Sequence, residues 1–290
     1  MRFLTDKKIE GALRCPVCGS EMVVVQGCGV SLVCGGEKRH CYDFSSRGYV
    51  NFAPPGHTLG GDSKQAVSSR TAFLDLQYYR PVAEKLKDTV KKYCMPEDGI
   101  IIDAGCGEGY YSAIIAEDGY SVLGVDLSKF AVDAASKRAG MRNINNAFFG
   151  VAGVHKLPVA DGSASAVVNV FAPCVEDEYF RVLKADGVLI TVWAGKDHLM
   201  GLKKAVYDVA YGNDGREDLP SRSCLIDETE VKFTIKIDNN TDIRRLFEMT
   251  PYYWKTSRHD FNKLSAIDSL ETEVDMMISV YRRDGVVAET

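Results

Sequence analysis

The strongest constraint on the fold of this chain is a glycine-rich turn near its middle. The apolar run Ile100-Ile-Ile-Asp-Ala104 leads into Gly105-Cys-Gly-Glu-Gly109, and a helix is predicted from about Tyr110. Three residues without a Cβ atom within five positions let the backbone turn sharply and let a ligand approach it closely. The sequence therefore predicts a strand, a tight turn and a helix over this segment.

Short apolar strands alternate with helices around this turn. An amphipathic helix is predicted over Arg80–Tyr93, and further helices from about Lys129, around Asp177–Leu183 and from His198 to about Tyr211. The predicted strands are Ile100–Ile102, Ser121–Val125, Ala147–Phe149, Ala166–Phe171 and Gly187–Val192, followed by a closing antiparallel pair, Val231–Ile237 and Val274–Tyr281. Such alternation is typical of a parallel sheet covered on both faces, so the predicted class is α/β and Rossmann-like.

The spacing of the glycines distinguishes between two kinds of cofactor. Dinucleotide-binding turns prefer G-x-G-x-x-G, whereas this turn is G-x-G-x-G with Asp103 two positions before Gly105. A carboxylate there repels pyrophosphate but attracts the ammonium and sulfonium groups of S-adenosylmethionine. Asp126 closes the next strand, where it can accept hydrogen bonds from both ribose hydroxyls. An ordinary βα turn would explain any one of these residues, but together they predict S-adenosylmethionine.

The predicted cofactor contacts follow from this arrangement. The turn contributes its own residues, Asp126 would bind the ribose, and the segment after the third strand would flank the adenine. In chain order the expected contacts are Asp103, Gly105, Gly107, Glu108, Gly109, Asp126, Ala152 and Gly153.

The N-terminal segment is rich in cysteine. Cys15-Pro-Val-Cys18 forms a two-residue-spaced pair, and Cys34 and the pair His40-Cys41 follow within a β-like segment too short to bury its own core. A tetrahedral Zn²⁺ bound by thiolates, with or without an imidazole, would hold such a segment together. His40, Cys41 and Cys28 compete for the remaining ligand places, and buried free thiols or a redox pair are the alternative.

Composition places the chain among ordinary globular proteins. It has 290 residues, of which 46% are hydrophobic and 26% charged, with a net charge of -5. No apolar stretch approaches the roughly 18 residues that span a bilayer, and the N-terminus lacks an apolar signal core, so we expect a cytoplasmic protein without a membrane partner. Turn-forming residues after Asn51 suggest three parts: a zinc-binding module (1–52), a flexible linker (53–78) and the Rossmann-like domain (79–290).

The motifs together resemble one family, the bacterial 23S ribosomal RNA guanine-N1 methyltransferases, which modify a hairpin lining the peptide exit tunnel. The resemblance spans nearly the whole chain and is carried by Cys15-Pro-x-Cys18, Arg39-His40-x-x-Asp43, Gly48-Tyr-Val-Asn51, Ala72-Phe-Leu-Asp75, Asp103-x-Gly-Cys-Gly-Glu-Gly-Tyr-Tyr111, Ala172-Pro-Cys174, His198-Leu-Met200 and Met249-Thr-Pro251. It implies a class I S-adenosylmethionine-dependent methyltransferase with a small N-terminal zinc module.

The resemblance also implies functions for individual residues. It selects Cys15, Cys18, Cys34 and His40 as zinc ligands and leaves Cys41 as the alternate, because the gap before the histidine is longer here than in the family. It further implies that Tyr79 and His198 contact the cofactor and that the partner is a hairpin of 23S ribosomal RNA.

The reaction expected from the resemblance is methyl transfer to N1 of a guanine in that hairpin loop. A base must leave its stack to be reached, and Phe171 or the cluster Tyr252-Tyr253-Trp254 could stack on it. Lys38, Arg39 and Arg47 beside the metal would bind phosphates. The sequence identifies no general base. A small-molecule methyltransferase, a non-catalytic RNA-binding assembly factor and a homodimer remain open alternatives.

Overall fold

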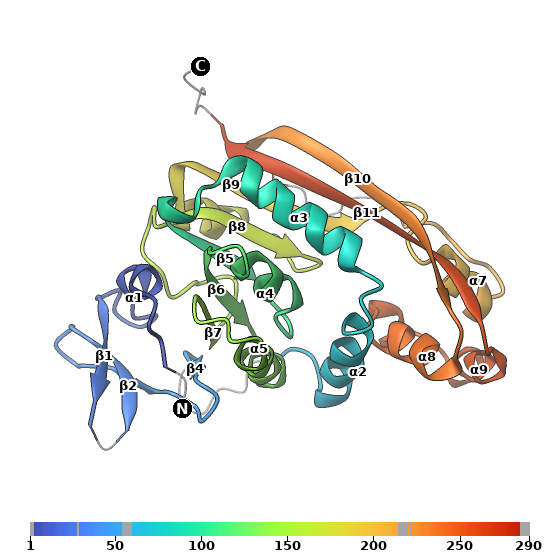
Figure 1. Ribbon diagram of the computed structural model, residues 1–290, viewed down its shortest axis with the longest axis horizontal. Coiled ribbons are helices and arrows are strands. Elements are labelled where there is room, and N and C mark those ends of the chain that lie inside the picture. Colours follow the sequence, from blue (N-terminus) through green and yellow to red (C-terminus); the bar gives the residue numbers. More distant parts are fainter. Residues whose placement is uncertain (1–2, 28, 54–59, 214–219, 221, 285–290) are drawn as a thin grey trace.

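A computed structural model describes residues 3–27, 29–53, 60–213, 220 and 222–284, and its main feature is one large sheet with helices around it (Figure 1). The strand order is β10-β11-β9-β8-β5-β6-β7-β4. The parallel strands are β4 (Val50–Asn51), β5 (Ile100–Ala104), β6 (Ser121–Asp126), β7 (Ala147–Val151), β8 (Ala164–Val170) and β9 (Leu183–Ala194). Antiparallel β11 (Leu270–Arg283) and β10 (Ser223–Ile237) extend the sheet beyond β9. The predicted α/β, Rossmann-like class and the closing antiparallel pair are confirmed.

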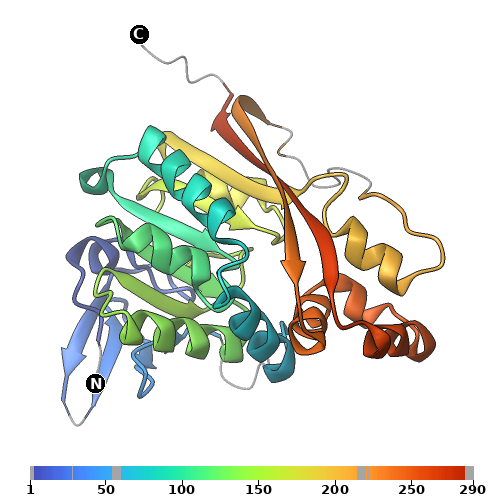
Figure 2. The same cartoon turned by 45° about the vertical axis from the view of Figure 1, so that its right-hand side comes forward.

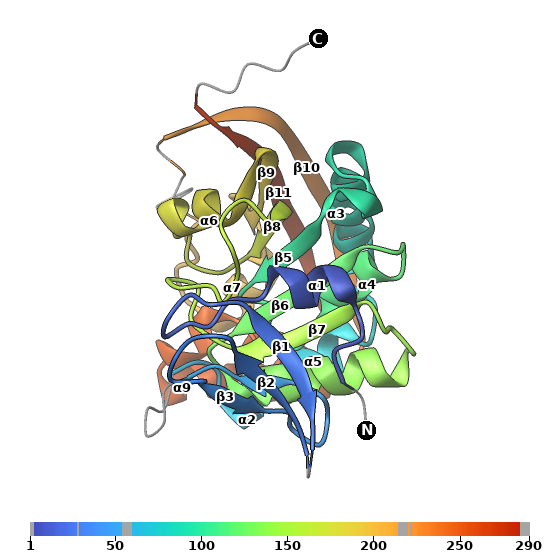
Figure 3. The ribbon, with the colours of Figure 1, turned by 90° about the vertical axis from the view of Figure 1, so that its left-hand side faces the viewer.

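Helices cover both faces of the sheet (Figure 3). On one face lie α3 (Arg80–Tyr93), α4 (Tyr110–Ala116) and α5 (Lys129–Met141), and on the other α1 (Lys7–Ala12) and α6 (Glu176–Val182). Ile101 packs under the first group, whereas Ile100 and Ile102 pack under the second. Since successive strand residues point to opposite faces and both faces are covered, the first three positions of β5 must all be apolar, which explains the isoleucine run seen in the sequence.

The N-terminal segment forms a small antiparallel sheet of β1 (Met22–Gln26), β2 (Val30–Cys34) and β3 (Cys41–Asp43). Its chain then enters the large sheet, because β4 pairs in parallel with β7 at the edge. Ile9 and Leu32 share a buried cluster with Ile102, and the backbone N–H of Arg14 donates to the carbonyl of Pro158 at 2.8 Å. The division into 1–52, 53–78 and 79–290 stays a prediction, but core and sheet run continuously across residue 52.

Two helices differ from expectation. Within the segment predicted as a flexible linker, α2 (Lys64–Leu74) is capped by Ser63, whose Oγ accepts a hydrogen bond from the Ala66 N–H, and it packs against α8 (Asn240–Glu248). Sequence patterns did not predict α2 because the helix that covers it lies far along the chain. α7 (Met200–Val206) is shorter than the helix predicted to Tyr211, since the chain turns back and the Tyr211 carbonyl accepts from Lys203 Nζ at 3.1 Å.

The C-terminal part builds a layer beside the ribbon of β10 and β11 (Figure 2). It comprises α7, α8 and α9 (Arg258–Lys263) with the short 3₁₀ helices η2 (Pro251–Trp254) and η3 (Leu264–Ala266), while η1 (Pro96–Asp98) precedes β5. Among the described residues, no helix has both the length and the apolar character needed to cross a membrane.

Candidate functional site

A cavity of ≈ 730 Å³ lies at the carboxyl ends of β5, β6, β8 and β9 and is closed from the other side by α2 and residues 248–252. The connections of the parallel strands diverge between β5 and β8, and such a switch point is the usual binding site of a doubly wound sheet. Its volume lies within the range of about 300–1,000 Å³ found for small-molecule sites. Seven of the predicted cofactor contacts line it: Tyr79, Asp103, Gly105, Gly107, Glu108, Asp126 and His198.

The glycine turn has the backbone geometry that its sequence predicts. Gly105, Gly107 and Gly109 have φ angles of 84°, 55° and 75°, in the region that side chains with a Cβ disfavour. A Cβ on Gly105 would lie 2.5 Å from the Cβ of Ala172, in the loop after β8. The turn is therefore in direct contact with the neighbouring loop, and there is no room for a larger residue.

Asp126 at the end of β6 is fixed by the backbone around it. Its Oδ2 accepts from the Gly107 N–H at 3.0 Å and its Oδ1 from the Ser128 N–H at 2.7 Å. Burial raises the pKa of this carboxyl despite the two donors. The carboxylate thus faces the cavity in a defined orientation, with the accepting capacity that two ribose hydroxyls would need.

Asp103 is fully buried at the end of β5, and the hydroxyl of Ser112 donates to it. Burial raises its pKa to about 7; the hydrogen bond from Ser112 lowers it, whereas the nearby carboxylates of Asp126 and Glu108 raise it. A cation beside Asp103 would reverse part of this shift by favouring the charged form.

Glu108 has its side chain in a buried ion pair with Arg138 of α5. Arg138 also donates to the Glu108 carbonyl at 3.2 Å and pairs with Asp75 at 2.6 Å. Burial raises the pKa of Glu108, which Arg138 opposes. One guanidinium therefore joins the glycine turn, α5 and the chain just after α2.

Tyr79 and His198 form a buried aromatic corner of the cavity, with ring centroids 6.1 Å apart. The Tyr79 hydroxyl is buried and has no hydrogen-bond partner among the described residues. His198 Nδ1 accepts from the Asp275 N–H at 3.2 Å, so the neutral ring carries its proton on Nε2, and burial lowers its pKa to about 4. An unpaired buried hydroxyl facing a cavity points to a ligand that supplies its partner.

Three predicted contacts lie outside the cavity lining. Gly109 is the N-cap of α4, and Ala152 and Gly153 follow β7, where the Ala152 N–H donates to the Asp126 carbonyl at 3.0 Å. The cavity wall in that region consists instead of Leu127, Val154 and His155.

The candidate stacking residues are also separated by the structure. Phe171 and Tyr252 line the cavity, whereas Tyr253 packs against Phe247 and Phe261. The side chain of Trp254 lies outside the described part of the chain.

Several cavity residues had no signal in the sequence. Arg70 pairs with Asp62 at 2.5 Å, and the Asp62 carbonyl accepts from Ser128 Oγ at 2.7 Å, so residues 61–62 cross beside the glycine turn. Asn213 donates to the Gly195 carbonyl at 2.7 Å and accepts from the Tyr252 hydroxyl at 2.9 Å. These residues come from segments far apart in the chain, and only the fold brings them together.

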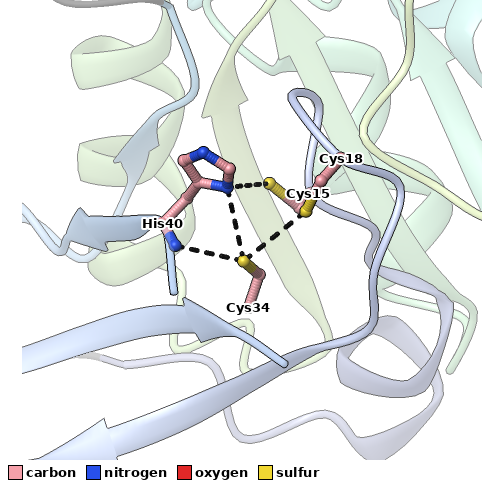
Figure 4. Close-up of side chains that lie close together, drawn as sticks. All are labelled: Cys15, Cys18, Cys34 and His40. Carbon is pink, nitrogen blue, oxygen red and sulfur yellow. Dashed lines mark hydrogen bonds between the residues drawn. The ribbon is translucent and has the colours of Figure 1, made fainter. Parts of the chain in front are cut away.

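The cysteine module gathers four potential metal ligands, Cys15, Cys18, Cys34 and His40, whose donor atoms all lie within 4.8 Å of one another (Figure 4). His40 Nδ1 is 3.5 Å from the sulfurs of Cys15 and Cys34, and the Cys18 and Cys34 sulfurs are 3.7 Å apart. Tetrahedral zinc requires roughly 3.6 Å and roughly 3.8 Å for such pairs, given its bond lengths. Cys41 is exposed and outside this group, and Cys28 lies outside the described residues.

Comparison with known proteins identifies the family. A protein-family sequence model described as a methyltransferase domain matches residues 101–187. The 23S rRNA (guanine(748)-N(1))-methyltransferase of Streptomyces fradiae is 31% identical over 256 residues, covering 86% of this chain and 88% of the relative. The chain belongs to the family of 23S rRNA guanine-N1 methyltransferases. YxjB of Bacillus subtilis, named as a 23S rRNA (guanine-N(1)-)-methyltransferase, is 28% identical over 283 residues, covering 92% of this chain and 95% of the relative.

Membership of this family makes the chain a methyltransferase with S-adenosylmethionine as its methyl donor, as the sequence predicted. The matched domain contains the glycine turn, Asp126 and Phe171, whereas the cysteine module precedes it. The similarity to the Streptomyces fradiae methyltransferase extends well beyond that domain.

Proposed function

We propose that this methyltransferase transfers the methyl group of S-adenosylmethionine to N1 of a guanine in a hairpin loop of 23S ribosomal RNA. The observation that carries the proposal is the 31% identity over 86% of the chain to a relative named for that reaction. The cavity supports it as well, since it combines the predicted cofactor residues with an exposed aromatic side chain, Phe171, on which a base could stack.

In this proposal the cofactor lies along the glycine turn. Asp126 would accept hydrogen bonds from the ribose hydroxyls, and Asp103 would face the ammonium of the methionine part. Tyr79 and His198 would each donate one hydrogen bond, Tyr79 through a hydroxyl that has no partner within the described protein and His198 through Nε2–H. The turn would be shaped by Gly105, Gly107, Glu108 and Gly109. Ala152 and Gly153 would lie behind Leu127, Val154 and His155, the part of the cavity wall expected to flank the adenine.

A zinc ion bound by Cys15, Cys18, Cys34 and His40 is the second part of the proposal. The donor separations suit tetrahedral coordination, and three thiolates with one imidazole form a donor set typical of structural zinc. The ion would stabilise the N-terminal sheet, which presents Lys38 and Arg39 to solvent. These two side chains would bind RNA phosphates; Arg47 is already paired with Asp133 at 2.9 Å.

The bound cofactor supplies an electrophilic methyl group on its sulfonium. The protein residues then have to hold the guanine in line with that methyl group and exclude water, because positioning and desolvation are the main sources of rate in such a transfer. Burial keeps His198 neutral at pH 7, with its pKa about 4, so it adds no positive charge beside a sulfonium. The proton on guanine N1 must leave during the reaction, and no described side chain is assigned as its acceptor.

The test is methyl transfer from labelled S-adenosylmethionine to transcripts of 23S ribosomal RNA, with the product mapped by mass spectrometry. We expect one methylated guanine in a hairpin loop and no labelling of small nucleosides or metabolites. Labelling of metabolites alone would favour a small-molecule methyltransferase. Cofactor binding without transfer to any acceptor would favour an RNA-binding assembly factor.

A further inference from the structure

Phe171 is an unusual residue in the cavity wall. Its φ angle is 54°, in the left-handed region that bulky side chains rarely adopt, and 51% of it is exposed. One ring face stacks on His198, with centroids 6.0 Å apart and planes 25° from parallel. The protein thus keeps a large apolar side chain half in solvent on a disfavoured backbone, which folding alone does not explain.

Buried side chains hold this loop from beneath. Asn169 accepts from the Ala172 N–H at 3.3 Å and donates to the Pro173 carbonyl at 3.0 Å. The Tyr179 hydroxyl donates to the same carbonyl at 2.8 Å. The N–H of Phe171 donates to the Val192 carbonyl of β9 at 3.1 Å. The loop is therefore fixed on both sides of Phe171, and the ring is presented by a rigid support.

The loop also adjoins the glycine turn. Ala172 is in contact with Gly105, so closely that a Cβ on the glycine would overlap it. A group resting on Phe171 would thus lie beside the part of the cavity assigned to the cofactor. The other aromatic candidates with described side chains are engaged: the Tyr252 hydroxyl donates to Asn213 while its ring lies under Lys203, and Tyr253 is packed against Phe247.

We infer that the outward face of Phe171 is the stacking platform for the target base of the RNA, giving the order His198, Phe171, base. The inference rests on the proposed function, since it assigns the residue that holds the unstacked nucleotide. An aromatic platform binds any base through its π face, so sequence specificity must come from other contacts.

The test compares Phe171→Leu with wild type in single-turnover transfer to a 23S hairpin transcript, alongside calorimetric titration of S-adenosylmethionine. Leucine keeps the apolar contact but removes the ring, so kcat/KM for RNA should fall about 5- to 150-fold, the range for loss of one stacked base. Cofactor affinity should stay within about twofold. Phe171→Tyr keeps the ring and should recover most of the loss.

Phe130→Leu is the matched control, because Phe130 is also 51% exposed but does not line the cavity. It should leave transfer unchanged. The inference is overturned if Phe171→Leu retains wild-type kcat/KM, or if it loses cofactor binding, which would assign the ring to the cofactor pocket. A wild-type protein that binds the cofactor but methylates no 23S transcript would refute the proposed function itself. That outcome differs from failure of the stacking inference, because it appears already in the unmutated chain.

Discussion

Replacement of Gly105 by alanine tests the packing of the glycine turn against the loop after β8. The new Cβ would lie 2.5 Å from the Cβ of Ala172 on a backbone with φ 84°. Neither side can move freely, because Asn169 accepts a hydrogen bond from the Ala172 N–H and the Gly105 N–H donates to the Val125 carbonyl at 2.9 Å.

The magnitude follows from two separate costs. An alanine with this φ costs about 1–2 kcal/mol through its backbone alone. Overpacking against a held loop adds about 1–3 kcal/mol. The free energy of unfolding should therefore fall by about 2–5 kcal/mol, which leaves a folded protein in all but the lowest part of the usual stability range of about 5–15 kcal/mol.

Gly119→Ala separates the two costs. Gly119 has a similar φ of 90°, but a Cβ there would meet no atom within 4 Å. Urea denaturation should thus show a loss of only about 1–2 kcal/mol for Gly119→Ala, the backbone part alone. Calorimetry should show unchanged cofactor affinity for Gly119→Ala and at least about tenfold weaker cofactor binding for Gly105→Ala. A tenfold loss of affinity corresponds to only about 1.4 kcal/mol of binding free energy. Equal destabilisation by the two substitutions, or unchanged cofactor binding by Gly105→Ala, would refute the reasoning.

Three further predictions concern the metal, an imidazole and a carboxyl group. Zinc removal by a chelator, or Cys15→Ser, should lower the melting temperature of the whole chain and weaken cofactor binding. The reason is that the module shares its core with β5 and hydrogen-bonds to Pro158, in the loop that also lines the cavity. Calorimetry that finds cofactor affinity unaffected would contradict this prediction. Burial lowers the pKa of His198 to about 4, so on acidification the unfolded chain takes up a proton near pH 6.5, before the folded chain does. The free energy of unfolding should therefore fall by up to about 3 kcal/mol as the pH drops from 6.5 to 4. Denaturation at pH 7 and pH 5 should show a weaker pH dependence for His198→Asn. Burial raises the pKa of Asp103 to about 7, so a bound ammonium group should lower that pKa and release a fraction of a proton at pH 7. Titration calorimetry in buffers of different ionisation enthalpy measures this proton release. If the release persists in Asp103→Asn, another group is its source.

Local patterns in the sequence were sufficient to predict the central sheet and its glycine turn. The isoleucine run of β5, the glycine spacing and the acids Asp103 and Asp126 act through neighbours in the chain or through adjacent strand ends, so spacing alone predicts where they lie. The four residues Cys15, Cys18, Cys34 and His40 were chosen by family resemblance, and the fold brings their donor atoms together. Spacing alone had left Cys41 and Cys28 in competition.

The far wall of the cavity could not be predicted in the same way. α2 lies in a segment whose turn-rich composition suggests a linker, yet it is ordered by packing on α8, whose first residue is Asn240. Asn213 lines the cavity from a segment without any motif, since contacts between distant segments leave no periodic trace in either one.

The sequence by itself determined the α/β class, the methyl donor and the cysteine module, because each depends on backbone geometry or ligand chemistry encoded within a few dozen residues. Tertiary structure decided which of the candidate aromatic side chains line the cavity. Phe171 and Tyr253 are alike in the sequence as aromatics beside a motif, but one is held outward on a strained loop and the other is packed into the core. Burial is a property of the assembled fold, so only the fold separates a stacking platform from a core residue.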